Sequence, residues 1–208
     1  VMHILALHET GSLNPDGVEI KERKDARGIP LDGIAFHPYY TAKDLVAIVV
    51  FLALFSAVVF FAPEMGGYFL EHANFEPANM LKTPEHIAPV WYFTPFYAIL
   101  RSVPSKGWGA FLMLMAIVLL FLLPWIDRCR VKSIRYRGWT YKLLLAMFVV
   151  SFLSLGYLGL QPATQKVFVY AARFFAAAYF GFFGLLWLTS GSERTKPVPE
   201  RVNYHASH

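Results

Sequence analysis

Four long runs of apolar residues divide the chain, at about residues 45–62, 109–126, 143–160 and 167–189. Each run is nearly free of charge, and the polar residues gather in the segments between the runs. A helix of roughly 20 apolar residues crosses a bilayer core about 30 Å thick, and a helix satisfies its own backbone amides in lipid. The pattern therefore predicts an all-α integral membrane protein with about four transmembrane helices.

The segments around these runs suggest three regions. Residues 1–43 begin with apolar residues that continue a helix until Gly11 and Asn14-Pro15 end it. This opening is expected to be the end of a preceding helix whose earlier turns are missing, as in a fragment, a split subunit or a trimmed chain. Residues 44–190 form the membrane region, and residues 191–208 form a polar tail.

Composition argues against a soluble domain. Of the 208 residues, 56% are hydrophobic and only 16% are charged, whereas soluble domains carry about 25% charged residues. A soluble protein with four buried helices is the alternative, but four such runs would leave almost no surface. The single cysteine, Cys129, excludes a disulfide framework within the chain.

The net charge of +5 comes mainly from the basic segment 127–137 and does not indicate nucleic-acid binding. Short loops rich in Lys and Arg stay in the cytoplasm. The charges therefore predict a multi-pass protein with residues 1–43, 127–142 and 190–208 cytoplasmic, and the expected location is a bacterial inner membrane. The long loop 63–108 and the turn 161–166 then lie on the outer side.

The outer loop has an unusual composition between residues 88 and 104, where it reads A-P-V-W-Y-F-T-P-F-Y-A-I-L-R-S-V-P. Loops of this length are usually functional or disordered, and aromatic residues with prolines argue against disorder. Aromatic walls with a few polar groups are typical of a site for a flat ring. An aromatic belt at the membrane interface is the alternative, although a belt does not need the fixed backbone that the prolines at 84, 89, 95 and 104 give this loop.

The inner side offers titratable residues. His3 and His8 are five helical residues apart, so their rings point roughly 140° apart and cannot bind one metal from one helix. A histidine in an apolar helix is a natural axial ligand of haem iron; a hydrogen-bonded interior histidine is the alternative for His3. His8 and Ser12, with Lys43 and Asp44, could exchange protons with a bound molecule or could be ordinary polar helix ends.

One further charge needs a partner. Arg173 lies within the fourth apolar run, about two turns from its outer end. It could extend outward to the interface or pair inside the protein.

At these residues the chain resembles the cytochrome b subunit of quinol–cytochrome c oxidoreductase (the cytochrome bc complex). The resemblance covers nearly the whole chain and corresponds to the C-terminal half of that family, from the end of its fourth transmembrane helix to its eighth. The matching motifs, in chain order, are Leu7-His8-Glu9-Thr10-Gly11-Ser12, Phe36-His37-Pro38-Tyr39-Tyr40 with Lys43-Asp44, Pro77-Ala78-Asn79, Thr83-Pro84 with His86-Ile87, Pro89-Val90-Trp91-Tyr92, Tyr97-Ala98-Ile99-Leu100-Arg101-Ser102, and Gly159 with Gln161-Pro162.

This resemblance implies a redox function. The family binds two b haems and acts on ubiquinol and ubiquinone: quinol is oxidised on the outer side and quinone is reduced on the inner side, which builds a proton gradient. His3 matches an axial ligand of the inner haem, and the other ligands would lie outside this chain. The implied partners are an N-terminal half of cytochrome b, the Rieske iron–sulfur protein, cytochrome c1 and membrane lipid, in a homodimeric complex.

The resemblance also assigns site residues. The inner quinone-reduction site would contain His8, Ser12, Phe36, Lys43 and Asp44. The outer quinol-oxidation site would contain Pro89, Val90, Trp91, Tyr92, Phe93 and Tyr97.

The outer motif departs from the family at one position. Val90 stands where the family has glutamate, and valine cannot accept the proton that a quinol releases. Glu85 or His86, on the same loop, is expected to replace that carboxylate, and Tyr97 is expected to contact the ring.

Three other functions fit less well. A split b6f-type complex has a C-terminal chain with three spans, whereas four are expected here together with His3. A non-catalytic membrane subunit would have no reason to keep the inner cluster. A transporter would show charged or helix-breaking features in at least two spans, and only Arg173 comes close.

Overall fold

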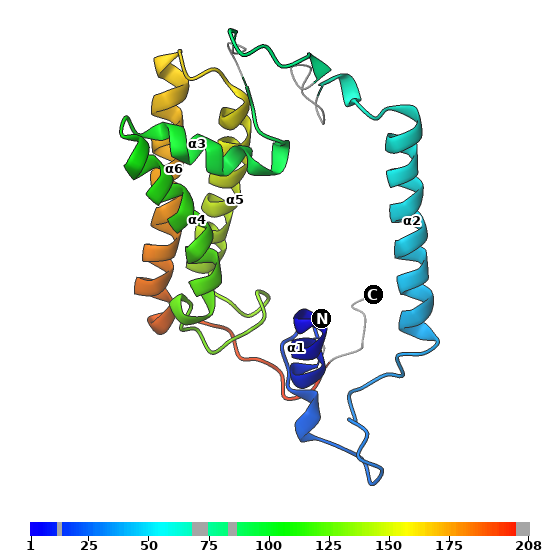
Figure 1. Cartoon of the computed structure of the whole chain (residues 1–208). Coiled ribbons are helices and arrows are strands. Elements are labelled where there is room, and N and C mark those ends of the chain that lie inside the picture. Colours follow the sequence, from blue (N-terminus) through cyan, green and yellow to red (C-terminus); the bar gives the residue numbers. More distant parts are fainter. Residues whose placement is uncertain (12–13, 68–74, 83–86, 203–208) are drawn as a thin grey trace.

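The computed structural model describes residues 1–11, 14–67, 75–82 and 87–202 (Figure 1). The α-helices are α1 (Met2–Thr10), α2 (Tyr39–Phe61), α3 (Thr94–Ser102), α4 (Lys106–Ile126), α5 (Trp139–Leu160) and α6 (Lys166–Thr189). Short 3-10 turns lie at η1 (Ile20–Glu22), η2 (Met65–Gly67), η4 (Trp91–Phe93) and η5 (Ser190–Ser192). Over these described residues, the only extended pairing is a single bridge between Lys24 and Pro30.

The four predicted spans are confirmed as α2, α4, α5 and α6, each long and apolar enough to cross a membrane. Each begins slightly before the apolar run that predicted it, because polar residues supply the first turn. Ser105, for example, precedes α4 and its hydroxyl accepts a hydrogen bond from the amide of Trp108 at 3.5 Å. The predicted all-α membrane architecture is therefore correct.

Helices α4, α5 and α6 form one bundle, and the short helix α3 lies across one end of it (Figure 1). Tyr179 of α6 is fully buried, and its hydroxyl donates to the carbonyl of Ala116 in α4 at 2.8 Å. The ring of Phe148 in α5 packs against Tyr179 and Phe182 at centroid distances of 5.1 and 4.6 Å. Aromatic packing thus joins α5 to α6, and the Tyr179 hydrogen bond joins α6 to α4.

Two glycines allow α3 to lie directly on the bundle. A Cβ atom at Gly159 of α5 would overlap the carbonyl of Thr94, and one at Gly109 of α4 would overlap the carbonyl of Leu100. Both neighbours are backbone atoms that cannot swing aside. The positions of α3 against α4 and α5 therefore depend on the absence of these two side chains.

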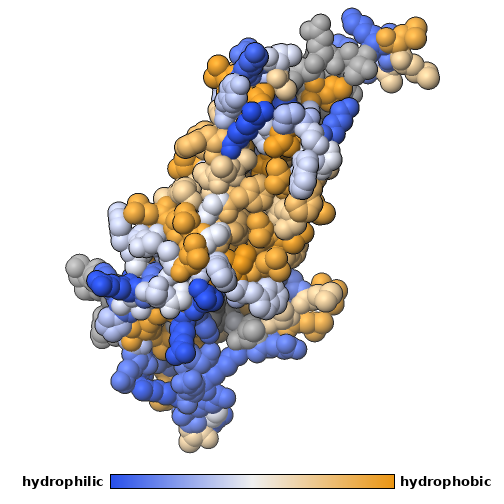
Figure 2. Space-filling view, turned by 90° about the vertical axis from the view of Figure 1, so that its left-hand side faces the viewer, coloured by the Kyte–Doolittle hydropathy of each residue, from blue (hydrophilic) through white to orange (hydrophobic). Residues whose placement is uncertain are grey.

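Helix α2 stands apart from the bundle (Figure 1), and none of its residues is buried. Viewed from the side of the bundle, the molecule shows a band of hydrophobic side chains between more polar ends (Figure 2). This is the surface expected where lipid surrounds the helices.

The ends of the molecule follow the alternation of the four spans. Helix α1, the loop between α4 and α5, and the residues after η5 lie at one end, and α3 lies at the other (Figure 1). We call the α3 end the outer end and the α1 end the inner end, following the orientation expected from the charges.

Candidate functional site

Three consecutive aromatic rings form a platform at the outer end, just before α3. Trp91, Tyr92 and Phe93 make up η4 and expose 52%, 53% and 51% of their surfaces. The Trp91 and Tyr92 rings meet edge to face at 5.5 Å, and Tyr92 and Phe93 lie 4.7 Å apart. About half of each ring is buried against its neighbours, and the other half is open to a ligand or a partner.

The platform is held by the start of α3. The hydroxyl of Thr94 donates to the carbonyl of Trp91 at 2.7 Å, and Thr94 and Pro95 are buried against the bundle. Proline in the first turn of a helix has a preset backbone angle and needs no hydrogen-bond acceptor there. The sequence therefore fixes the direction in which the three rings leave the helix.

Arg101 fastens the other end of α3 to α5. Its Nη2 atom lies 3.0 to 3.1 Å from the carbonyl oxygens of Leu158, Gly159 and Gln161, which end α5. The guanidinium also lies 4.3 Å from the centre of the Tyr97 ring. A cation at a helix C-terminus is favourable, and here it also sets the place of Tyr97.

Arg173 is exposed but contacts the end of α3. Its Nε donates to the carbonyl of Ser102 at 2.6 Å, at the end of α3. A charge in a membrane helix is costly unless it has a partner, and the buried backbone carbonyl at the C-terminus of α3 supplies one. Both arginines at the outer end therefore hold α3 in place.

The cavity behind Arg101 is too small for a ring. It measures about 10 Å³, lies between α3, α5 and α6, and is lined by Arg101, Gln161 and Phe168. Such a volume holds about one water molecule. The Nε of Arg101 is buried without a hydrogen-bond partner among the residues that the structure describes, which suits a water there. This cavity therefore does not hold a flat ligand.

At the inner end, α1 carries the two histidines. The Nδ1 of His8 lies 2.8 Å from the carbonyl of Ile4, and a carbonyl can only accept a hydrogen bond. His8 therefore holds a proton on Nδ1, which leaves Nε2 as the atom that can take up or deliver a proton.

His3 suits a haem ligand in one respect and is incomplete in another. Its side chain is exposed, and no hydrogen bond to it occurs within the described part of the chain. The neighbouring Met2 and Ile4 are 85% and 54% exposed, which suits contact with a porphyrin. The described residues contain no group of three or more potential metal ligands, so a second histidine for a haem iron would have to come from outside the described residues.

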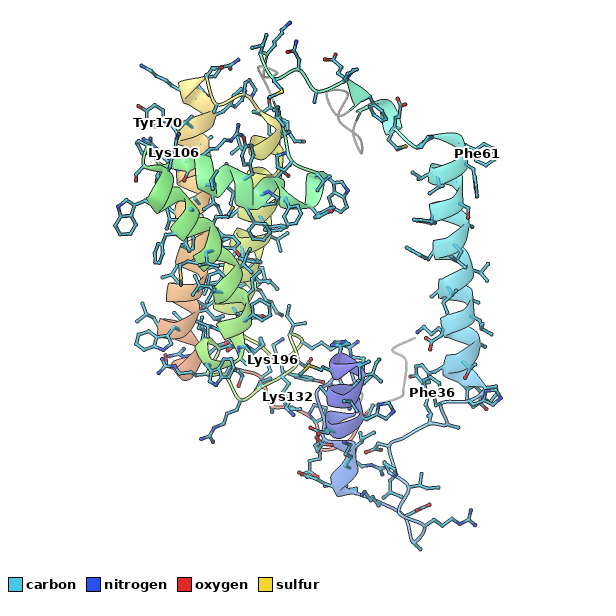
Figure 3. All side chains as sticks on the ribbon, in the orientation of Figure 1. Phe36, Phe61, Lys106, Lys132, Tyr170 and Lys196 are labelled. Carbon is cyan, nitrogen blue, oxygen red and sulfur yellow. The ribbon has the colours of Figure 1, made fainter. Side chains whose placement is uncertain are left out.

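The remaining predicted inner residues lie at the start of α2. Phe36 is 65% exposed and stacks on Tyr40 at 6.2 Å, while Lys43 and Asp44 are exposed in the first turns of α2. They share the inner end with α1 but lie on a separate element (Figure 3). Ser12, Glu85 and His86 lie outside the described residues.

Sequence reasoning missed a clasp beneath α1. The side chain of Asp16, only 7% exposed, accepts hydrogen bonds from the Tyr136 hydroxyl at 2.9 Å and from Arg135 at 3.0 Å. The hydroxyl of Ser133 donates to the carbonyl of Pro15 at 2.5 Å. Burial, together with the hydrogen bond to Asp16, raises the pKa of Tyr136. The α4–α5 loop thus holds the segment that follows His8.

A second clasp joins the inner ends of the bundle helices. Arg137 lies 2.7 Å from both Asp127 and Glu193, and the Arg137 and Glu193 side chains are each 5% exposed. Burial alone would lower the pKa of Arg137, but hydrogen bonds to the two carboxylates outweigh it and raise the pKa. The guanidinium therefore stays charged and connects α4, α5 and α6.

A third ion pair ties the C-terminal segment to the inner loop. Arg201 lies 2.8 Å from Asp32, whose side chain is 6% exposed. The hydrogen bond from Arg201 lowers the pKa of Asp32, and the same bond raises the pKa of Arg201. No spacing in the sequence indicates this pair, because 169 positions separate its members.

Comparisons with known proteins identify the family to which this chain is similar. The family model described as cytochrome b(C-terminal)/b6/petD matches residues 77–180. The chain is 54% identical to the cytochrome b of Allochromatium vinosum, covering 97% of this chain and 50% of that protein. It is 44% identical to the cytochrome b of Rickettsia prowazekii, covering 96% of this chain and 47% of that protein.

A solved structure extends the similarity to three dimensions. A chain of a structure titled hyperthermophilic respiratory Complex III superposes with a TM-score of 0.80 at 36% identity, covering 91% of this chain and 46% of that one. The chain spans about half the length of the curated relatives named above.

Proposed function

Because the chain belongs to the cytochrome b family and matches its C-terminal part, we propose that it builds part of two quinone sites in a respiratory complex of the cytochrome bc type. Quinol is oxidised at the outer end and quinone is reduced at the inner end. Together the two reactions release protons outside and take them up inside.

The observation that carries the proposal is the aromatic platform at the outer end. Trp91, Tyr92 and Phe93 each expose about half of their surface, and both ends of α3 are fastened to the bundle. Binding a ring to such a surface orders little further protein structure, because the three side chains are already held in place. The ubiquinol ring lies against these side chains, with Tyr97 beside it.

The proton acceptor at this site must replace a missing carboxylate. Val90 is 39% exposed beside the platform but has no group that binds a proton. Glu85 or His86, a few residues earlier on the same loop, takes the proton from the quinol hydroxyl. Substitution of each residue by glutamine separates the two: the variant that loses quinol oxidation identifies the acceptor, and unchanged rates in both exclude both.

At the inner end, His8 delivers a proton to the quinone. Its Nδ1 donates to the Ile4 carbonyl at 2.8 Å, so Nε2 is the atom that exchanges a proton with the quinone. Ser12, Phe36, Lys43 and Asp44 complete this site, with Lys43 and Asp44 supplying charges from the first turns of α2.

His3 would hold one b haem together with a second ligand from the N-terminal half of the cytochrome. Haem, when bound, carries electrons between the two ends of the protein. The exposed surfaces of α1 and α2 fit against that N-terminal half. The Rieske iron–sulfur protein and cytochrome c1 complete the homodimeric complex, in a bacterial inner membrane.

The optical spectrum of the purified complex tests the assignment. In His3→Leu, the reduced-minus-oxidised spectrum should lose about half of the b-haem absorbance, because one of two haems loses a ligand. The matched variant His8→Leu, on the same helix, should keep the full absorbance. An unchanged spectrum in His3→Leu would contradict the proposal.

A further inference from the structure

An open pocket of about 370 Å³ lies at the inner end, between the α4–α5 loop and the ends of these two helices. Leu123 and Pro124 from the last turns of α4 and Tyr141 from the first turn of α5 give it apolar walls. Cys129 and Lys132 line it from the loop. Nothing in the proposed quinone chemistry uses this pocket.

The loop around the pocket carries more positive charge than the protein neutralises. Between residues 127 and 142 there are six Lys and Arg residues against a single Asp. Arg135 and Arg137 bind carboxylates. Arg128 donates to the backbone carbonyl of Trp187, and the Arg128 guanidinium lies 5.0 Å from the centre of the Trp187 ring. The side chains of Arg130 and Lys132 make no ion pair with any residue that the structure describes.

The pocket lies where lipid headgroups lie. Trp125, at the end of α4, and Trp139, at the start of α5, are 71% and 72% exposed, and tryptophan gathers at the level of the headgroups. Lys132 lies at this level, below the bundle in Figure 3. A ligand that enters here meets apolar walls toward the membrane and an ammonium group toward the water.

The only carboxylate in the pocket is already satisfied. Asp127 binds Arg137 through both oxygens, at 2.7 and 3.2 Å. Its charge is therefore compensated within the clasp, and the free charge that a ligand meets is that of Lys132. This argues for an anionic ligand rather than a cation.

We propose that this pocket binds the phosphate group of an anionic phospholipid. The phosphodiester lies against Lys132, and the first carbons of the acyl chains lie on Leu123, Pro124 and Tyr141. Basic pockets between transmembrane helices on the cytoplasmic side bind anionic headgroups in this way. Free inorganic phosphate has the same charged group but no acyl chains to lie on the apolar walls, so the apolar contacts distinguish a phospholipid from free phosphate.

The test uses the complete complex in nanodiscs of phosphatidylcholine with a minor fraction of phosphatidylglycerol. Native mass spectrometry counts the phosphatidylglycerol that stays bound after detergent extraction. Lys132→Gln should retain about fivefold less of it at this site, since one interfacial lysine contributes that much. Lys132→Arg should retain the wild-type amount. Lys132 makes no internal ion pair in the described chain, so both variants are expected to fold.

Lys196→Gln is the matched control, because it removes the same charge from an exposed residue of the inner end that does not line the pocket. Equal loss in Lys196→Gln, or no loss in Lys132→Gln, would overturn the proposal, since the binding would then be general surface attraction or absent. Displacement of the lipid by millimolar inorganic phosphate, with no preference for phosphatidylglycerol over phosphatidylcholine, would overturn the lipid as the source.

Alkylation of Cys129 gives a local readout in the same samples. Cys129 is partly exposed and lines the pocket. Phosphatidylglycerol should slow its reaction with a maleimide several-fold in the wild type and much less in Lys132→Gln, as measured on the Cys129 peptide. Equal rates in nanodiscs with and without phosphatidylglycerol would contradict occupation of the pocket.

Discussion

Arg137 holds two carboxylates at the inner ends of three helices, which makes it a sensitive residue for stability. In Arg137→Met, Asp127 and Glu193 lose their cation, and Glu193 is only 5% exposed. Removing one partner from a buried ion pair costs about 3 kcal/mol. Thermal unfolding of the complex should shift down by several degrees in Arg137→Met, whereas Arg130→Met should change the midpoint little. Equal midpoints would show that the clasp does not stabilise the bundle.

The ion pair between Asp32 and Arg201 makes the stability of the fold depend on pH. Because its folded pKa lies below the ordinary value of 3.8, Asp32 stabilises the fold at any pH above that value. The stabilisation is lost as the pH falls below 3.8 and through the lower folded pKa. The unfolding midpoint of the wild type should therefore exceed that of Asp32→Asn by a constant amount between pH 7 and 5, and the difference should shrink as the pH falls below 3.8. A difference that does not shrink below pH 3.8 would exclude this titration.

Single residues divide into those that the sequence could predict and those that it could not. His3, His8 and the aromatic run at 91–93 could be singled out by their side-chain chemistry alone, and the structure places them on α1 and η4. Asp16 and Asp32 look like ordinary loop acids, and their partners lie 119 and 169 positions away. Only the folded chain brings such pairs together.

At the scale of elements, α3 depends on its close fit to α5. Gly159→Ala puts a methyl group into the carbonyl of Thr94, which must move α3 and the platform that it carries. A displacement of about 1 Å in a reacting site can cost about a hundredfold in rate, so quinol–cytochrome c reductase activity should fall by at least about tenfold.

Gly156→Ala is the control for this change. Gly156 lies one turn earlier on α5, and the nearest atom to an added Cβ would be Cγ of Pro95 at an ordinary 3.7 Å. It should keep near wild-type activity. Equal activity in Gly159→Ala and Gly156→Ala would show that the position of α3 does not limit the reaction.

The four long helices were predictable because a span needs only length and continuous apolar character, and both are visible in the sequence. Helix α3 was not predicted as a helix, since it has 9 residues and a proline in its first turn. Its place follows from Gly109, Gly159, Arg101 and Arg173, which act across the chain. The prolines and aromatics indicated an ordered loop but could not give its direction.

At the scale of the molecule, α2 stands apart from the bundle (Figure 1), and both expose apolar residues. None of the 23 residues of α2 is buried, and the apolar residues of α1 are exposed. Lipid can cover α2, whereas the sites proposed for the exposed His3 and His8 on α1 need a partner. The sequence indicated this need only through its resemblance to cytochrome b, because no local pattern shows what lies beside a helix.

The most direct test follows the b haems of the complex in a stopped-flow instrument after quinol is added. Trp91→Leu should slow their reduction about tenfold, since the loss of about 1.4 kcal/mol of ring contact corresponds to that factor. Trp108→Leu, which removes another exposed outer tryptophan, should leave that rate unchanged. His8→Leu should leave the reduction rate unchanged and slow only the reoxidation through the inner site. Wild-type reduction in Trp91→Leu, or equal slowing in Trp108→Leu, would contradict a quinol site on the platform.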